Sequence, residues 1–102
     1  MTTDFRKTEP VISLGVFLAL VFDVNGFESR HGTRYRVHKL QHDVMYLGRD
    51  QVPNDEICAL DLFNVYQAYQ QLSDFSALEI KRLVPELPAA AQGLLLHLGM
   101  IE

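Results

Sequence analysis

The chain has a single cysteine, Cys58, and no tryptophan among its 102 residues. One cysteine excludes a disulfide within the chain, and such usage is typical of proteins from a reducing compartment. We therefore expect a cytoplasmic location. The longest apolar stretch, residues 11–24, falls short of the roughly 18 apolar residues that suggest a membrane span, so no membrane partner is expected. Residues 11–22 have the length of a signal-peptide core, but no small-x-small cleavage site follows Phe22.

Positive charge is also scarce, with 9 Lys and Arg against 13 Asp and Glu and a formal net charge of −4. This balance argues against a protein whose whole surface binds nucleic acid. The basic residues are unevenly spread, however, because five of the nine lie between Arg30 and Arg49. The length and a 48% hydrophobic content indicate one globular domain, residues 1–102, with residues 1–8 as a loose or partly docked arm.

Patterns that carry catalytic chemistry are missing. The six glycines are scattered, so none forms a phosphate-binding loop, and no serine lies in a nucleophile elbow. His38 and His42 have the i, i+4 spacing of helical metal ligands, but no further ligand pair accompanies them. Cys58 has the position of a small buried hydrophobe. We therefore expect no enzyme, no cofactor and no metal.

The clearest element is a helix over residues 54–72, predicted to lie at the centre of the fold. Asn54 is a suitable N-cap, and Asp55 and Glu56 place negative charge at the positive end of the helix dipole. Apolar residues recur at helical spacing along it, at Cys58, Leu62, Val65, Tyr66, Tyr69 and Leu72.

Two further segments are predicted as helices before it. Residues 11–24 are apolar almost all round and favour a buried helix, because fourteen residues is long for a strand. A hairpin with its turn at Asn25-Gly26 is the alternative for this segment. Residues 34–47 are predicted as a second helix from the seam Val37, Leu40, Val44 and Leu47, with Gly48 as its stop.

Two helices follow the central one. Ser76 and Glu79 form an S-x-x-E capping box that starts a helix through Val84, which Pro85 ends. Pro88 suits the first position of a last helix that runs to Leu98 and is closed by Gly99. The predicted fold is therefore all-α, a bundle of about five helices. An α+β fold with an N-terminal hairpin is the alternative.

The C-terminal segment has a short helix at 76–84, a tight turn, a second helix at 88–98, and an ending Leu98-Gly99-Met100-Ile101-Glu102. In this order residues 64–102 resemble the helix-turn-helix superfamily of the winged-helix type. The resemblance implies a tri-helical unit in which 88–98 is the recognition helix. That helix has only Gln92 and His97 as polar side chains. It contains no Arg or Lys, although Arg, Lys, Asn and Gln are the residues that usually read base edges.

The leading functional prediction is a small non-enzymatic regulatory protein that binds a protein partner, with a homodimer as the simplest form. Leucines surround the last helix too broadly for one buried face, so some should be exposed and form an interface. The predicted interface residues are Leu94, Leu95, Leu96, Leu98 and Met100. The alternative is a DNA-binding or transcription-regulatory module with a basic face at 30–39. The residues predicted for phosphates or an acidic partner are Arg30, Arg34, Arg36, Lys39, Lys81 and Arg82.

Overall fold

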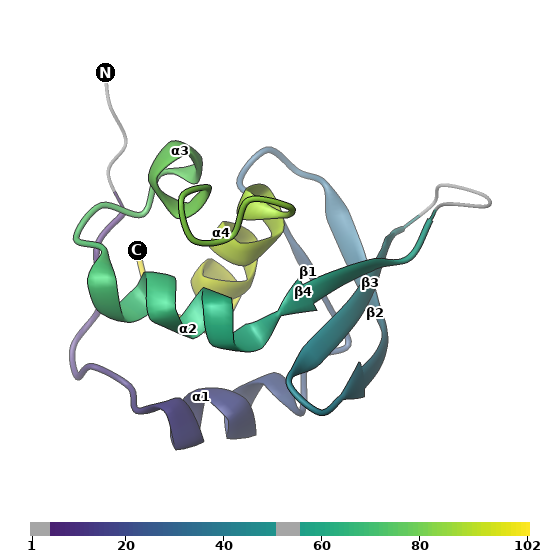
Figure 1. Cartoon of the computed structure of the whole chain (residues 1–102), viewed down its shortest axis with the longest axis horizontal. Coiled ribbons are helices and arrows are strands. Elements are labelled where there is room, and N and C mark those ends of the chain that lie inside the picture. Colours follow the sequence, from purple (N-terminus) through teal and green to yellow (C-terminus); the bar gives the residue numbers. More distant parts are fainter. Residues whose placement is uncertain (1–4, 51–55) are drawn as a thin grey trace.

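The computed structural model describes residues 5–50 and 56–102 and contains a sheet as well as helices (Figure 1). In chain order the elements are α1 (Leu14–Val21), β1 (Gly26–Glu28), β2 (Arg34–Gln41), β3 (Val44–Arg49), β4 (Cys58–Asp61), α2 (Leu62–Gln71), α3 (Ala77–Ile80) and α4 (Pro88–His97). The four strands form one antiparallel sheet in the order β1-β2-β3-β4. The predicted all-α bundle is therefore wrong. The α+β alternative is the right class, but its strands lie in 26–61 and not in 11–24.

The segment predicted as the second helix is a β-hairpin. Polar and apolar side chains alternate along β2, and that period of two is the strand pattern. His42, at the turn before β3, has a positive φ of 55°. The apolar seam at helical spacing arises from the pairing of the two strands, since Val37 lies opposite Leu47 and Leu40 opposite Met45. Three members of the seam do face the core, but they reach it from two strands.

The predicted central helix is shorter than expected and starts later. Residues 58–61 form β4, and α2 begins at Leu62 with Asp61 as its N-cap, whose carboxylate accepts from the Asn64 N–H. The proposed caps Asn54 and Asp55 lie outside the described residues. Leu62, Val65, Tyr66 and Tyr69 are buried as predicted, whereas Cys58 is exposed on the sheet edge.

The helix predicted over 11–24 exists as the shorter α1, capped by Ser13, whose hydroxyl accepts from the Val16 N–H. The prediction that it is buried holds for one side alone, because within α1 only Phe17 and Val21 lie in the core.

The C-terminal signals are confirmed at several positions. The Ser76 hydroxyl accepts from the Glu79 N–H, Pro88 opens α4, and Gly99 has a φ of +74° just after it. The first of these helices ends at Ile80, earlier than predicted, and three turn residues follow.

One face of the sheet packs on the helices and the other faces solvent. The buried or half-buried side chains on the inner face are Phe27, Tyr35, Val37, Leu40, Met45, Leu47 and Leu60. In Figure 1 the helices lie to the left of the sheet, with α4 between α3 and β1 and with α1 beneath α2. The core therefore lies between the sheet and the pair α2 and α4.

The described part of the N-terminal arm is docked against the C-terminus. The backbones of Arg6 and Glu102 exchange two hydrogen bonds of 2.9 Å, and the Thr8 N–H donates to the Met100 carbonyl at 3.0 Å. This pairing holds Met100 and Ile101 in the core.

A glycine pair tests this packing. In Gly93→Ala the new Cβ would lie 2.8 Å from the Glu28 carbonyl oxygen of β1, so the variant should lose about 1–3 kcal/mol of unfolding free energy. Gly15→Ala is the control, because nothing lies within 4 Å of its Cβ position, and it should be neutral or stabilising by up to about 1 kcal/mol. Urea denaturation measures both, and equal effects would contradict the α4–β1 contact.

Candidate interaction surfaces

The leucines predicted to form an interface are mostly buried. Leu94, Leu95 and Met100 have no exposed surface, so the prediction is wrong for these three, while Leu96 and Leu98 are half-buried. The reason is the position of α4, which is covered from several directions by β1, α3 and the core. A helix that is apolar all round is therefore satisfied inside the molecule.

The same burial bears on the recognition-helix assignment. Residues 90–95 of α4 are all buried, and six consecutive helical residues span more than one full turn. No side of this part of α4 is therefore free to enter a DNA groove. The helix-turn-helix resemblance itself stays a prediction.

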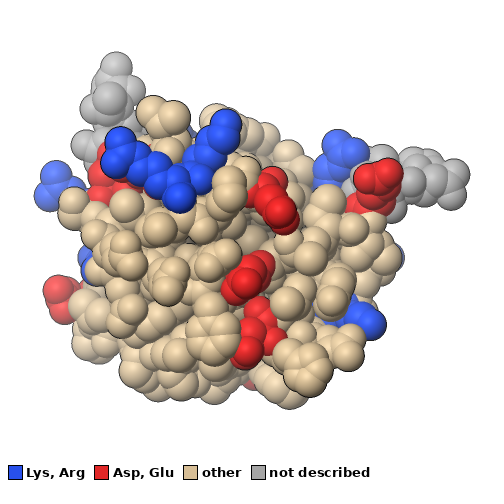
Figure 2. Space-filling view, viewed as in Figure 1, with Lys and Arg blue, Asp and Glu red and all other residues tan. Residues whose placement is uncertain are grey.

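The predicted basic residues do not form one surface. Arg34, Arg36 and Lys39 are exposed on β2, whereas Lys81 and Arg82 follow α3. Figure 2 shows one group of Lys and Arg at the upper left, over α3, and others at the right, over the sheet. Arg30 lies in neither a strand nor a helix. Its guanidinium group lies 5.4 Å from the Phe5 ring centroid.

A bulge keeps the basic side chains of β2 on its outer face. The pairing with β3 shifts register between Val37 and Lys39, which makes His38 an extra residue in the strand. Lys39 therefore faces solvent while Leu40 packs inward. The Lys39 ammonium lies 5.2 Å from the centroid of Tyr46 on β3, so the charge rests on an aromatic ring.

An ion pair and an acidic neighbour also mark this outer face. Arg36 makes an ion pair with Asp50 at 3.0 Å, and its side chain is 66% exposed. The backbone of Arg34 pairs with that of Glu28 on β1, so an acidic residue also lies beside the basic ones. The charge of the outer face is therefore mixed, with Arg34 and Lys39 as the basic side chains at its two ends.

The histidines and the cysteine do not come together as a metal site. His38 lies on a strand over Gly48, and His42 lies in the following turn, so the helical i, i+4 geometry does not arise. Among the described residues no group of three or more His, Cys, Asp or Glu side chains could hold a metal ion. The Cys58 thiol is exposed and lies 3.8 Å from the Glu56 carbonyl oxygen.

Sequence reasoning missed an exposed apolar surface on α1. Phe22 is 80% exposed, Val16 49% and Leu20 37%, and no charged residue occurs in the helix. We define the α1 surface as these three residues with Val11 before the helix and Phe63 in the first turn of α2. In Figure 2 the lower left of the molecule, where α1 lies in Figure 1, is almost entirely free of charged side chains.

Phe63 joins this surface because α1 and α2 run antiparallel (Figure 1). The ring centroids of Phe17 and Tyr66 are 5.5 Å apart, and Phe63 precedes Tyr66 by about one helical turn. Phe63 therefore lies at the same end of the helix pair as Leu20. The signal for this surface was present in the sequence, since residues 11–24 have no polar face for solvent.

Two tyrosines of α2 fix α1 in place. The Tyr66 hydroxyl donates to the Ile12 carbonyl at 2.7 Å, and the Tyr69 hydroxyl accepts from the Ile12 N–H at 3.0 Å. The N–H and the carbonyl of Ile12, the residue before the Ser13 cap, are thus both hydrogen-bonded to side chains. The position of the α1 surface depends on this clamp as well as on Phe17 and Val21.

No helix in the described residues is long and apolar enough to cross a membrane. Comparisons with protein-family models, with curated proteins and with solved structures find no match to the chain.

The tyrosine clamp makes a testable prediction. Tyr66→Phe removes the donor to the Ile12 carbonyl and should lower the unfolding free energy by about 1 kcal/mol, with a larger loss if that carbonyl stays dry. Tyr46→Phe is the matched control, because its ring contacts Lys39 on the outer sheet face. Thermal and urea unfolding of the two variants measure the difference. Equal stability would show that the clamp does not hold α1.

Proposed function

We propose that the chain is a non-enzymatic interaction protein that binds a protein partner through the α1 surface. The observation that carries this proposal is the composition of the solvent side of α1, which consists of Gly15, Val16, Ala19 and Leu20. A surface helix of a monomer normally presents polar side chains to water. This helix presents none, and Phe22 extends the apolar area beyond its C-terminus.

The size of the surface supports the proposal. From their exposed fractions, its five side chains expose on the order of 400–500 Å² of apolar area, and patches of that size on monomers are often functional. A stable interface buries about 800 Å² on each partner, so this area would form its apolar centre and neighbouring residues its rim. Removing it from water contributes to binding without requiring any charge on the partner.

A second copy of the chain is one partner that fits this surface. In a two-fold dimer the same patch meets itself, and an uncharged patch does so without like-charge repulsion. On the exposed side of α1, Gly15 has no side chain and Ala19 has only a methyl group, so a second helix can approach closely. A different protein with an apolar groove would use the same side chains.

The test replaces an apolar side chain in the centre of the surface with a charge. Leu20→Glu should abolish association, because a carboxylate would be buried in an apolar interface, while stability should change little at a partly exposed site. Leu78→Glu on α3 is the matched control, since Leu78 is 76% exposed and lies away from α1. Sedimentation equilibrium at tens of micromolar should show a wild-type dimer that only Leu20→Glu dissociates.

If the wild type is monomeric, a photo-cross-linking residue at position 20 and one at position 78 separate the remaining outcomes. Protein adducts formed only at position 20, in cells that express the chain, would support a different partner for the α1 surface. A monomer with no such adducts would refute the proposal.

A second candidate function, binding of nucleic acid, is favoured by the outer face of β2. Arg34 and Arg36 project from the same side of the strand about 7 Å apart, and the bulge adds Lys39 to that side. Such a row can follow successive phosphates of a backbone. The acidic neighbours Glu28 and Asp50 weaken it, so this remains the second candidate.

Salt dependence tests this candidate directly. Binding to labelled duplex DNA at low salt should weaken as salt rises, and the double variant Arg34→Ala with Lys39→Ala should reduce the slope of log affinity against log salt by about 1.8. The double variant Lys81→Ala with Arg82→Ala removes the same charge near α3 and should leave the slope unchanged. Absence of binding at low salt, or equal effects of the two variants, would eliminate the candidate.

A further inference from the structure

In the described part of the chain, the sheet has one covered edge and one open edge. At the β1 edge, α4 packs so closely that the Cβ position of Gly93 is 2.8 Å from the Glu28 carbonyl oxygen. At the other edge β4 pairs with β3 on one side, and no strand among the described residues pairs with its other side. An open strand edge presents unpaired N–H and C=O groups to any extended chain.

The register identifies which groups of β4 face outward. The Leu62 N–H donates to the Asp43 carbonyl at 2.8 Å, and these two residues continue the register in which Leu60 faces Met45. In an antiparallel pair, hydrogen-bonded and non-hydrogen-bonded positions alternate. The intervening residues Ala59 and Asp61 therefore direct their backbone groups away from β3, toward the open edge.

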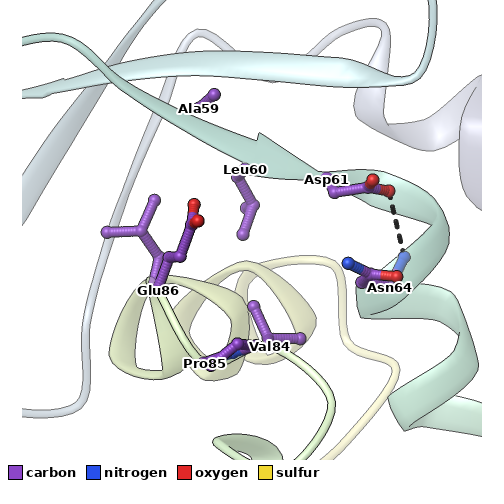
Figure 3. Close-up of a pocket in the computed structure, with 8 residues that line it drawn as sticks. Ala59, Leu60, Asp61, Asn64, Val84, Pro85 and Glu86 are labelled. Carbon is purple, nitrogen blue, oxygen red and sulfur yellow. Dashed lines mark hydrogen bonds between the residues drawn. The ribbon is translucent and has the colours of Figure 1, made fainter.

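A groove runs along this edge. Its cavity of about 190 Å³ is lined by residues 59–61 and Asn64 on one side and by residues 84–87 on the other. Figure 3 shows the β4 strand and the segment before α4 facing each other across it, with the Glu86 side chain extending toward Leu60. The groove thus gives an incoming chain a second wall besides the strand.

The charged side chains that line the groove are both acidic. They are Asp61, whose carboxylate also caps α2, and Glu86 from the opposite wall. Figure 2 shows a column of Asp and Glu between the helices and the sheet, with Lys and Arg kept to the periphery of this view. The groove therefore complements positive charge, whereas the outer face of β2 carries basic side chains.

We propose that the open edge of β4 binds an extended, cationic segment of a partner protein as a fifth strand. The Ala59 and Asp61 N–H groups and the Ala59 carbonyl supply the backbone hydrogen bonds of strand addition. Lys or Arg side chains at alternate positions of the segment reach the carboxylates of Asp61 and Glu86. This site is separate from the α1 surface, and neither proposal depends on the other.

The probe is a blocked nine-residue peptide in which Val and Lys alternate, titrated into the whole chain. The amide resonances of Ala59 and Asp61 should shift on binding, because their N–H groups gain hydrogen bonds. Glu86→Gln should weaken binding about two- to fivefold, the range of an exposed ion pair. Glu28→Gln removes an equal charge from β1 and should leave binding unchanged, as should Leu20→Glu on the α1 surface.

Backbone pairing is tested separately from charge. Two further probes carry methyl groups on every second peptide nitrogen, at odd positions in one and at even positions in the other (the two methylation phases). Each phase blocks one edge of the peptide, so one phase should abolish binding and the other should preserve it. The same peptide with Glu in place of Lys should not bind. Shifts confined to residues outside β4 and 84–87, equal binding in both phases, or equal effects of Glu86→Gln and Glu28→Gln would overturn the proposal. Concentration-dependent shifts of Ala59 and Asp61 without peptide would assign the edge to a second copy instead.

Discussion

The close approach of α4 to β1 is the contact on which the rest of the structure depends. Gly93 allows it, since a Cβ at that position would collide with the Glu28 carbonyl oxygen. Beside it the buried Gln92 amide donates to the Phe75 carbonyl at 2.8 Å, which fixes the loop before α3 on the same helix. The C-terminal residues after α4 then pair with residues 6–8. One buried helix thus connects the sheet, α3 and both described ends of the chain.

This arrangement leaves α1 at the periphery. Since α4 and α2 already fill the inner face of the sheet, α1 contributes only Phe17 and Val21 to the core and is held by the tyrosines at Ile12. Folding therefore does not account for the apolar side chains on its outer side. The proposed partner contact would remove these exposed leucine, valine and phenylalanine side chains from water.

Local signals in the sequence predicted local features well. The Ser76 cap, Pro88 at the start of α4 and Gly99 after it depend on the chain within a few residues, and the structure confirms all three. The sheet was missed because Val37 and Leu47 also fit helical spacing, although the alternation of polar and apolar residues along β2 is the strand pattern. The resulting error moved the candidate interface to α4, whose leucines needed a sheet to bury them. The exposed side of α1 was missed as well, although residues 11–24 have no polar face for solvent.

The two proposed protein contacts depend on different interactions. The α1 surface offers apolar area and no charge, so association there should be largely insensitive to salt. The β4 edge has oriented backbone groups and two carboxylates beside its apolar lining, so its binding must weaken as salt screens the carboxylates. The formal charge of −4 therefore says little about partners by itself, because the groove beside β4 is lined by acidic side chains while the outer face of β2 carries basic and acidic ones together. A salt titration of any partner found for this chain distinguishes the two surfaces before a single residue is changed.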